Sequence, residues 1–427
     1  MVTGLTTSGT GSHSHGGPSL ETRFGSLFAE LAEIGRRPDG SYDRKAWTPE
    51  DASARQWFQS QASRLGLACE VDRNGNLWAW WGGPGAKAVV TGSHLDTVVG
   101  GGAFDGAVGV VAGFAALEHL MRLNRPPRRP IAVVAFADEE GARFGVPTFG
   151  SRLMMGQLEP AAVRRRDDGH STTVEEALRA ASLDPDALGA DEARVNRIDT
   201  FIEVHIEQGT DLAHADYPIG LAESVWPHGR WRLSLAGSPN HAGTARMRDR
   251  HDPMLVAASG ILGARQIASD DAVFATVGKV AIKPNSANSI AESVDLWLDL
   301  RASSDVILDA ALEEWMAAVR KAAQPHTVDL NLTCESRSLG VGFDRGLREA
   351  IRELAGHRPV PTLSTAAGHD AAVLASSCRT AMIFVRNHTG INHARAEAAT
   401  LEDCAVATDL LAAAFLRLAI DEPAEGV

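Results

Sequence analysis

The sequence predicts an α/β fold in which a larger domain is interrupted by a smaller α+β domain. Alternating strand and helix patterns dominate the first half of the chain, as in α/β proteins. The middle changes to a strand–helix–strand–strand–helix–strand order, which is typical of a compact α+β unit. The strand and helix alternation then resumes. A chain of 427 residues is also longer than one hydrophobic core usually grows, so two domains are expected.

The first half supplies most elements of the larger domain. Helices are expected at 20–36, 49–65, 106–123, 150–155 and 173–181, and strands at 68–72, 77–81, 88–92, 131–137 and 199–207. The helix at 106–123 is apolar and rich in Gly and Ala, which suits close packing against a sheet.

The inserted domain is expected to contain four strands and two helices. Its strands are predicted at 231–236, 272–282, 295–301 and 327–334, and its helices at 253–267 and 307–323. After about residue 342 a helix, a strand at 380–385 and a closing helix at 401–419 complete the larger domain. We therefore expect a disordered tail at 1–20, a larger domain formed by 21–222 and 336–427, and an inserted domain at 223–335.

Composition excludes several classes of protein. The net charge of −13 argues against general binding to nucleic acid or anionic membranes, and no apolar run is long enough to cross a membrane. The Gly-, Ser- and Thr-rich start, which includes His13 and His15, lacks the features of a signal peptide. Four scattered cysteines without CxxC spacing predict reduced thiols in a cytoplasmic protein.

The most informative feature is the pair Glu139 and Glu140, which follows the apolar strand predicted at 131–137. Because strand side chains alternate, adjacent glutamates at a strand end point in different directions. One can bind a metal ion while the other faces a water molecule as a general base. The alternative for an isolated pair is a solvated acidic turn.

Other polar side chains follow neighbouring strands, where sites assemble in α/β sheets. Five segments carry candidate groups: His94 with Asp96, Asp105, Glu139 with Glu140, His205 with Gln208, and His393. His, Asp and Glu are suitable ligands for Zn²⁺ and similar ions. Taken singly, His205 could be a core histidine, Asp105 a turn residue, and His94 and His393 ordinary loop histidines.

These segments also resemble a known family. The motifs Gly92-Ser-His-Leu-Asp-Thr-Val98, Gly102-Ala-Phe-Asp-Gly106, Asp138-Glu-Glu-Gly141 and Phe201-Ile-Glu-Val-His-Ile-Glu-Gln-Gly209 are together similar to the M20 metallopeptidase clan. The segments His205-Ile-Glu-Gln-Gly209 and Asn240-His-Ala-Gly-Thr244 resemble its hydantoinase/carbamoylase branch of amidohydrolases. That branch includes N-carbamoyl-L-amino acid hydrolases, allantoate amidohydrolases and β-ureidopropionases. The resemblance runs from about residue 25 to about residue 418.

The resemblance implies an M20-like catalytic domain with a mixed sheet flanked by helices, interrupted by a ferredoxin-like dimerisation (lid) domain. It also implies two divalent metal ions per subunit, with Zn²⁺ expected first and Mn²⁺, Co²⁺ or Ni²⁺ as alternatives. The implied ligands are His94, Asp105, Glu140, His205 and His393, of which Asp105 bridges both ions. Glu139 would be the base that activates a metal-bridging water, and Asp96 would orient His94.

The same resemblance implies residues that hold the substrate. His241 would be contributed across the interface of a homodimer to polarise the scissile carbonyl. Asn288 and Arg301 would hold a substrate carboxylate, for which the planar guanidinium fork is suited. Gln208 and His369 would line the pocket. The alternative for Arg301 is a surface salt bridge.

Two departures from the family pattern leave the substrate open. The last motif reads Gly390-Ile-Asn-His-Ala-Arg-Ala-Glu397, with Asn392 in place of a serine and Arg395 in place of a proline. Arg246 adds another cation after His241. None of these changes removes an implied ligand.

The sequence therefore predicts a cytoplasmic, homodimeric, metal-dependent amidohydrolase. It would cleave the ureido or carbamoyl C–N bond of a small carboxylate substrate, such as an N-carbamoyl-L-amino acid or allantoate. One alternative is an N-acyl amino acid hydrolase or peptidase of the same clan. A more remote alternative is a non-catalytic binding protein on the same scaffold, although Glu139 and all implied ligands are present.

Overall fold

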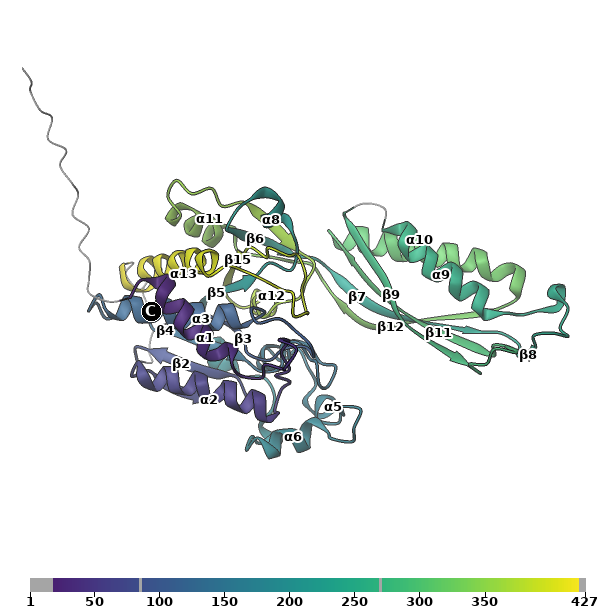
Figure 1. Ribbon diagram of the computed structural model, residues 1–427, viewed down its shortest axis with the longest axis horizontal. Helices are drawn as coiled ribbons and strands as arrows, with labels where there is room; N and C mark the ends of the chain where they lie inside the picture. Colours follow the sequence, from purple (N-terminus) through teal and green to yellow (C-terminus); the bar gives the residue numbers. More distant parts are fainter. Residues whose placement is uncertain (1–17, 84–86, 269–270, 422–427) are drawn as a thin grey trace, which may run out of the picture.

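Two sheets of unequal size organise the chain. The computed structural model describes residues 18–83, 87–268 and 271–421. A larger unit with a nine-stranded sheet lies at one end of the long axis, and a narrower unit with a four-stranded sheet extends from it (Figure 1). The predicted fold class, an α/β unit with a mixed sheet interrupted by an α+β unit, is confirmed.

The large sheet has the order β1-β2-β4-β3-β5-β15-β6-β13, and β14 also pairs with β6. Its strands are β1 (Ala68–Val71), β2 (Leu77–Trp81), β3 (Ala88–His94), β4 (Ile131–Phe136), β5 (Ile198–Ile206), β6 (Ile219–Val225), β13 (Val341–Gly342), β14 (Thr362–Thr365) and β15 (Arg379–Val385). The central strands β4, β3, β5 and β15 are parallel and almost completely buried, which explains their apolar sequences. Their carboxyl ends consequently meet at one edge of the sheet.

Within the described residues, eleven helices accompany this sheet, some packed on its faces and others on neighbouring helices or loops. They are α1 (Leu20–Ala32), α2 (Pro49–Arg64), α3 (Ala107–Met121), α4 (Phe149–Met154), α5 (Pro160–Arg164), α6 (Val174–Ala180), α7 (Glu192–Val195), α8 (Asp211–Ala215), α11 (Arg345–Leu354), α12 (Asp370–Leu374) and α13 (Leu401–Phe415). Helix α3 packs directly on β3 and β5, beneath α1 and α13. A Cβ atom at Gly109 would lie 2.4 Å from the carbonyl oxygen of Val204, so glycine permits this close approach.

The smaller unit has one covered and one open sheet face. Its sheet has the order β12-β7-β11-β9, formed by β7 (His228–Ala236), β9 (Val273–Lys283), β11 (Ser293–Ala302) and β12 (Asp329–Ser338). Helices α9 (Pro253–Ile267) and α10 (Asp305–Ala323) pack on one face around buried Leu233, Leu296 and Trp315. The short strands β8 (Asn240–His241) and β10 (Ser289–Ile290) pair separately at the far end.

The boundaries between the units differ in detail from the sequence prediction. The expected division between residues 222 and 223 falls inside β6, and the first strand of the small sheet begins at His228. The last strand of that sheet runs to Ser338, beyond residue 335. The functional division into a catalytic and a lid domain stays a prediction.

Helix α1 begins at Leu20, where the oxygen of Ser19 accepts a hydrogen bond from the backbone of Thr22. The expected tail therefore overlaps the helix start. Residues 1–17 of that tail, including His13 and His15, lie outside the described residues.

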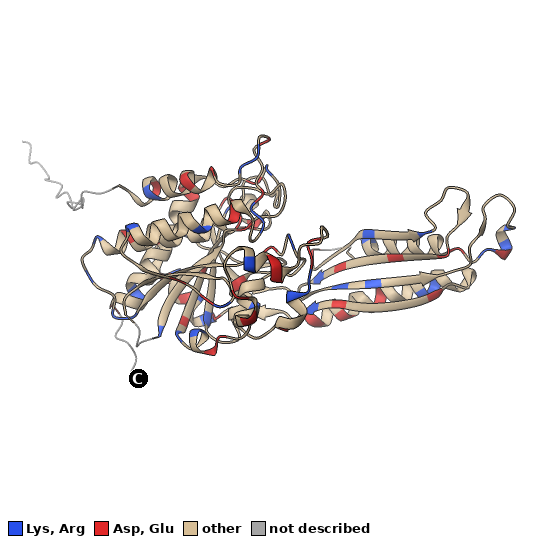
Figure 2. Cartoon of the chain, turned by 90° about the horizontal axis from the view of Figure 1, so that it is seen from below, with Lys and Arg blue, Asp and Glu red and all other residues tan. Residues whose placement is uncertain are grey.

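Other general predictions can be compared directly. All four cysteines are free thiols, as expected, whereas the cytoplasmic location stays a prediction. No helix within the described residues is long and apolar enough to cross a membrane. Figure 2 shows acidic and basic residues interspersed along both units, without a continuous basic stretch in that view.

Candidate metal centre

The carboxyl ends of three neighbouring strands bring the predicted ligands together. His94 is the last residue of β3, and His205 is the penultimate residue of β5. Glu139 and Glu140 follow β4 after a turn at Asp138, whose φ of 51° lies in the left-handed region. Since β3 pairs in parallel with both β4 and β5, these side chains converge at one edge of the sheet.

Asp105 lies at the centre of the group. Its Oδ1 atom is 3.2 Å from Nε2 of His205 and 3.7 Å from Nε2 of His94. Its Oδ2 atom is 3.3 Å from Nε2 of His393, which is itself 3.4 Å from Oε2 of Glu140. The five predicted ligands thus form two groups, His94–Asp105–His205 and Asp105–Glu140–His393, each spanning no more than 4.8 Å, and Glu203, His205 and His369 form a third such group beside them. The carboxylate of Asp105 is shared by the first two groups.

The turn after Asp105 explains how His94 approaches so closely. Gly106 has a φ of 64°, and a Cβ atom there would lie 2.4 Å from the His94 ring. A side chain at this position would therefore both strain the backbone and displace the imidazole.

The residues fit divalent metal ions. The Oδ2 atom of Asp105 and the Oε1 atom of Glu140 are buried and accept no hydrogen bond from the described residues. Such atoms usually have a partner, and three imidazoles with two carboxylates are a suitable donor set for Zn²⁺ or a similar ion.

The Nδ1 atoms of His94 and His205 lie 3.0 and 2.8 Å from the backbone carbonyls of Asp96 and Ile206. Each carbonyl accepts from a protonated Nδ1, which leaves Nε2 available to a metal.

Two side chains of the metal-free site retain protons, for different reasons. Burial, with the charges of Asp105 and Asp96, raises the pKa of Glu140 to about 10. Burial opposes protonation of His205, but its hydrogen bond to Asp105 and the charge of that carboxylate raise its pKa to about 9. Both groups are therefore protonated at neutral pH when no metal is bound.

Metal binding is consequently expected to release protons. Glu140 and His205 must each lose a proton to become ligands, so affinity for Zn²⁺ or Mn²⁺ should increase as the pH is raised through their pKa values of about 10 and about 9. Calorimetric titration in buffers with different ionisation enthalpies measures the number of protons released. An affinity independent of pH, with no proton release, would contradict this assignment.

The two adjacent glutamates point to different partners, as expected, although both lie beyond the end of β4 and not in a strand. Glu140 approaches His393, whereas Oε2 of Glu139 lies 3.7 Å from Nε2 of His94. Burial, followed by the charges of Asp370 and Glu140, raises the pKa of Glu139 well above the usual glutamate range. A carboxyl group in this environment is suited to holding a proton during a reaction.

Asp96 contacts both the glutamate pair and His94. Its two carboxylate oxygens accept the backbone N–H groups of Glu139 and Glu140 at 3.1 and 3.0 Å. The hydrogen bond from His94 reaches the Asp96 backbone carbonyl, and the carboxylate lies farther away at 3.8 Å. Asp96 thus fixes the glutamate pair in addition to contacting His94.

Two buried carboxylates at the site were not assigned roles from the sequence. Glu203 accepts hydrogen bonds from the side chain of Ser93 at 2.7 Å and the backbone of Ala371 at 2.9 Å. Glu397 accepts the backbone N–H groups of Phe104 and Asp105 at 3.2 and 3.0 Å. A glutamate between the apolar residues Ile202 and Val204 of β5 was the one available signal for Glu203.

Two of the four predicted substrate residues contact this centre, and a third, Arg301, contacts the segment that precedes His369. Nε2 of Gln208 is 3.4 Å from Oδ1 of Asp105, and His369 packs against His205 with ring centroids 4.5 Å apart. Arg301 donates to the carbonyl of Ala366 at 2.7 Å, which places it beside the loop that carries His369. Its Nε atom also pairs with Asp299 at 2.9 Å.

His241 and Asn288 lie elsewhere. Both are exposed on the tip formed by β8 and β10, where the backbone of Ala242 donates to the carbonyl of Asn288 at 2.9 Å. Figure 1 shows β8 at the end of the small unit farthest from the large sheet. Within one chain, therefore, His241 and Asn288 are not brought to the metal ligands.

The two additional arginines are also exposed. Arg246 lies in the tip loop after His241, and Arg395 lies two residues after His393. Nη1 of Arg395 is 3.4 Å from the carbonyl of Asp39.

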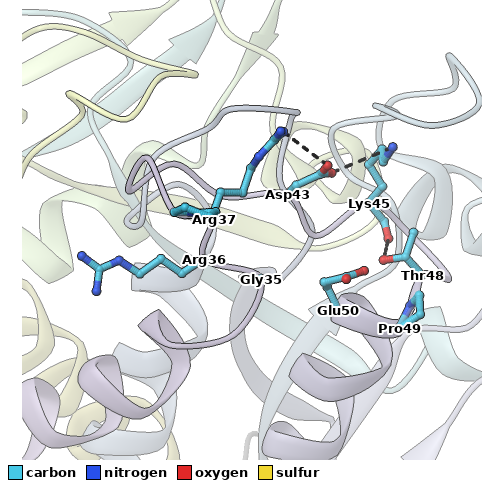
Figure 3. Close-up of a pocket in the computed structure, with 9 residues that line it drawn as sticks. Gly35, Arg36, Arg37, Asp43, Lys45, Thr48, Pro49 and Glu50 are labelled. Atoms are coloured by element: carbon cyan, nitrogen blue, oxygen red, sulfur yellow. Dashed lines mark hydrogen bonds and ion pairs between the residues drawn. The ribbon is translucent and has the colours of Figure 1, made fainter.

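A separate pocket of about 510 Å³ lies between the segment at 35–45 and the start of α2 (Figure 3). Two of its cations, Arg37 and Lys45, lie 3.7 and 4.0 Å from the carboxylate of Asp43. None of the predicted site residues lines this pocket.

Comparison with known proteins supports the same family. The sequence profile described as peptidase family M20/M25/M40 matches residues 74–417. An N-carbamoyl-L-amino acid amidohydrolase from Geobacillus stearothermophilus is 35% identical over 90% of this chain and 94% of its own length. An allantoate amidohydrolase from Escherichia coli is 29% identical over 91% of this chain and 96% of its own.

Solved structures show the same fold. An amidase of the hydantoinase/carbamoylase family from Burkholderia vietnamiensis superposes with a TM-score of 0.83 and 29% identity. The match covers 94% of this chain and 98% of that protein.

Proposed function

Because this chain belongs to peptidase family M20/M25/M40, we propose that it is a metal-dependent amidohydrolase that cleaves the ureido or carbamoyl C–N bond of a small carboxylate substrate. The observation that carries this proposal is the convergence of His94, His205 and His393 on Asp105, with Glu139 beside them. Zn²⁺ or Mn²⁺ would be held as two ions, one by His94 and His205, one by Glu140 and His393, with Asp105 between them.

Bound divalent ions would supply Lewis-acid activation of water and polarisation of the scissile carbonyl. The chain itself supplies the proton transfers. Glu139 takes a proton from the attacking water at its side-chain carboxylate and passes it to the leaving nitrogen. For an N-carbamoyl amino acid, the products are the amino acid, ammonia and carbon dioxide.

Arg301 is the proposed anchor for the substrate carboxylate. It belongs to the smaller unit but donates to the carbonyl of Ala366 in the larger unit, three residues before His369, which packs on His205. A guanidinium group can bond both oxygens of a carboxylate. Asp299 holds Nε of Arg301 and leaves part of the fork available.

His241 is the proposed group that polarises the carbonyl. Its Nδ1 atom accepts the backbone N–H of Gly243 at 3.0 Å, so the neutral ring carries its proton on Nε2. This exposed N–H is a suitable donor to a carbonyl oxygen. Since the tip lies far from the metal ligands of its own chain, we propose that it serves the site of a second subunit in a homodimer (Figure 1).

The smaller unit carries a surface suited to that dimer. Helix α9 exposes Met254, Leu255, Ile261 and Leu262, with 65% of Leu262 accessible. In the described part of the chain, the neighbouring strand β9 lies at an edge of the four-stranded sheet and pairs only with β11. Exposed apolar side chains beside an open strand edge are typical of interfaces between subunits.

Replacing Leu262 tests this surface. Leu262→Asp is expected to produce a monomer that still binds metal but loses most of its activity, because His241 no longer reaches a second subunit. Light scattering after size-exclusion chromatography measures the mass, with the exposed Ala317→Asp on α10 as the matched control. A fully active monomer would contradict the composite site.

A substrate panel tests the reaction class. Ammonia release is measured with Mn²⁺- or Zn²⁺-loaded protein on allantoate, N-carbamoyl-L-amino acids and N-carbamoyl-β-alanine. An N-acetyl amino acid and a dipeptide are followed in parallel by amino-acid release. Turnover of a ureido compound supports the proposal. Activity confined to the acetyl or dipeptide substrates would instead identify an acyl hydrolase or peptidase.

A further inference from the structure

We propose that Glu397 is a positioning residue that holds together the half of the metal centre formed by Asp105, Glu140 and His393. The inference extends the proposed function, because it presumes the two metal ions of that site. Glu397 is only 4% exposed, although it follows the exposed His393 by four residues. Its side chain therefore turns back from the surface into the site.

The carboxylate of Glu397 fixes the backbone that carries Asp105. Its Oε1 atom accepts two backbone N–H groups, those of Phe104 at 3.2 Å and Asp105 at 3.0 Å. Asp105 is the shared residue of the two ligand groups, so rotation of its peptide would move both of its oxygens. Hydrogen bonds of this kind commonly orient the ligands of metal sites.

Gly102 leaves room for this carboxylate. A Cβ atom at Gly102 would lie 2.4 Å from Oε1 of Glu397 and 2.6 Å from its Cβ atom. The carboxylate is thus pressed against the backbone of the loop that contains Asp105, and no side chain can occupy position 102 without displacing it.

The backbone of Glu397 restrains the loop that carries His393. The backbone N–H of Glu397 donates to the carbonyl of Ala394 at 3.0 Å, which forms a turn immediately after His393. The side chain of His393 is 51% exposed, compared with 1% for His94 and 2% for His205. His94 and His205 are held by packing within buried strands, whereas His393 lies on a loop that Glu397 ties to Asp105.

Loss of the Glu397 carboxylate should therefore affect the two ligand groups unequally. The His94 and His205 side chains remain fixed by β3 and β5. The loop that carries His393 would no longer be tied to the backbone of Asp105. The affinity for the metal ion at Asp105, Glu140 and His393 should therefore fall much more than the affinity for the other ion.

The test counts metal ions in the full-length protein. Wild type, Glu397→Ala, Glu397→Gln and Gly102→Ala are stripped of metal and titrated with Mn²⁺, with bound metal measured by atomic spectroscopy. Glu402→Ala, an exposed glutamate at the start of α13, is the control. Wild type and control should bind two equivalents, and Glu397→Ala should bind its second equivalent about 10- to 100-fold more weakly.

The other two variants separate positioning from general damage. Glutamine keeps an oxygen that can accept both N–H groups, so Glu397→Gln should recover the second equivalent. Gly102→Ala retains Glu397 but displaces its carboxylate, so it should resemble Glu397→Ala and decides the question if Glu397→Ala fails to fold.

Two results would overturn the inference. One is a second equivalent bound with wild-type affinity in both Glu397→Ala and Gly102→Ala. The other is a Glu397→Gln protein as defective as Glu397→Ala. A wild-type protein that binds two ions but hydrolyses no ureido compound would contradict the proposed function and leave the role of Glu397 intact.

Discussion

Glu139→Gln is expected to lower kcat by about 10²- to 10⁴-fold while the protein keeps its metal, since this is the usual contribution of a positioned general base. Glutamine has nearly the same shape as glutamate but cannot take a proton from water. The two hydrogen bonds from the backbone of residues 139 and 140 to Asp96 do not involve the altered side chain and should persist. Ammonia release gives kcat, and atomic spectroscopy gives the metal content.

The neighbouring residue provides the matched comparison. Glu140→Gln removes a carboxylate that lies 3.4 Å from His393, so it should reduce metal binding as well as turnover. The two variants therefore distinguish a base from a ligand at adjacent positions. Near-normal activity of Glu139→Gln would contradict its role as the base. Full metal occupancy in Glu140→Gln would contradict the role of Glu140 as a ligand.

His241→Ala is expected to abolish most activity and to be rescued by a different inactive subunit. After subunit exchange with Glu139→Gln, each mixed dimer should contain one site with an intact Glu139 and an intact His241 from its partner. With random exchange, half of the dimers are mixed, so activity should return to about one quarter of the wild-type value. The structure motivates this expectation because His241 lies on the distant tip of its own chain (Figure 1).

Copurification of differently tagged subunits verifies that exchange has occurred. Each variant exchanged with itself should remain inactive. Mixed dimers without recovered activity would show that His241 does not act across the interface in the proposed way.

Several of the candidate site residues could be predicted because they have a local sequence signal. His94, Glu139 and His205 occur at the ends of apolar runs, and parallel strands align such ends at one edge of a sheet. Glu139 and Glu140 point in different directions, as expected, but strand alternation is not the reason: β4 ends at Phe136, and both glutamates follow the left-handed turn at Asp138. The order of these motifs along the chain then supported the resemblance to one family.

The supporting contacts had no comparable signal. Glu397 and Glu203 act on the backbone of segments distant in sequence, and such hydrogen bonds leave no periodic pattern. The prediction for Asp96 was incomplete for the same reason. It named only the orientation of His94, whereas the Asp96 carboxylate also accepts the backbone N–H groups of residues 139 and 140.

The positions of Arg301 and His241 could not be separated from sequence either. Both belong to the small unit, but Arg301 stands at the end of β11 beside the large unit, whereas His241 is at the opposite tip. That difference depends on strand direction and register. The sequence also did not predict β6. The expected domain boundary between residues 222 and 223 therefore fell inside this strand.

The central claim is that a metal centre built on Asp105 hydrolyses a ureido bond. The most direct test titrates metal-free protein with Mn²⁺ or Zn²⁺ while ammonia release from an N-carbamoyl-L-amino acid and from allantoate is followed in the same sample. We expect no ammonia without metal and a rate on at least one substrate that rises until two ions are bound per chain. Ureido hydrolysis by the metal-free protein, or none by the fully loaded protein, would contradict the account.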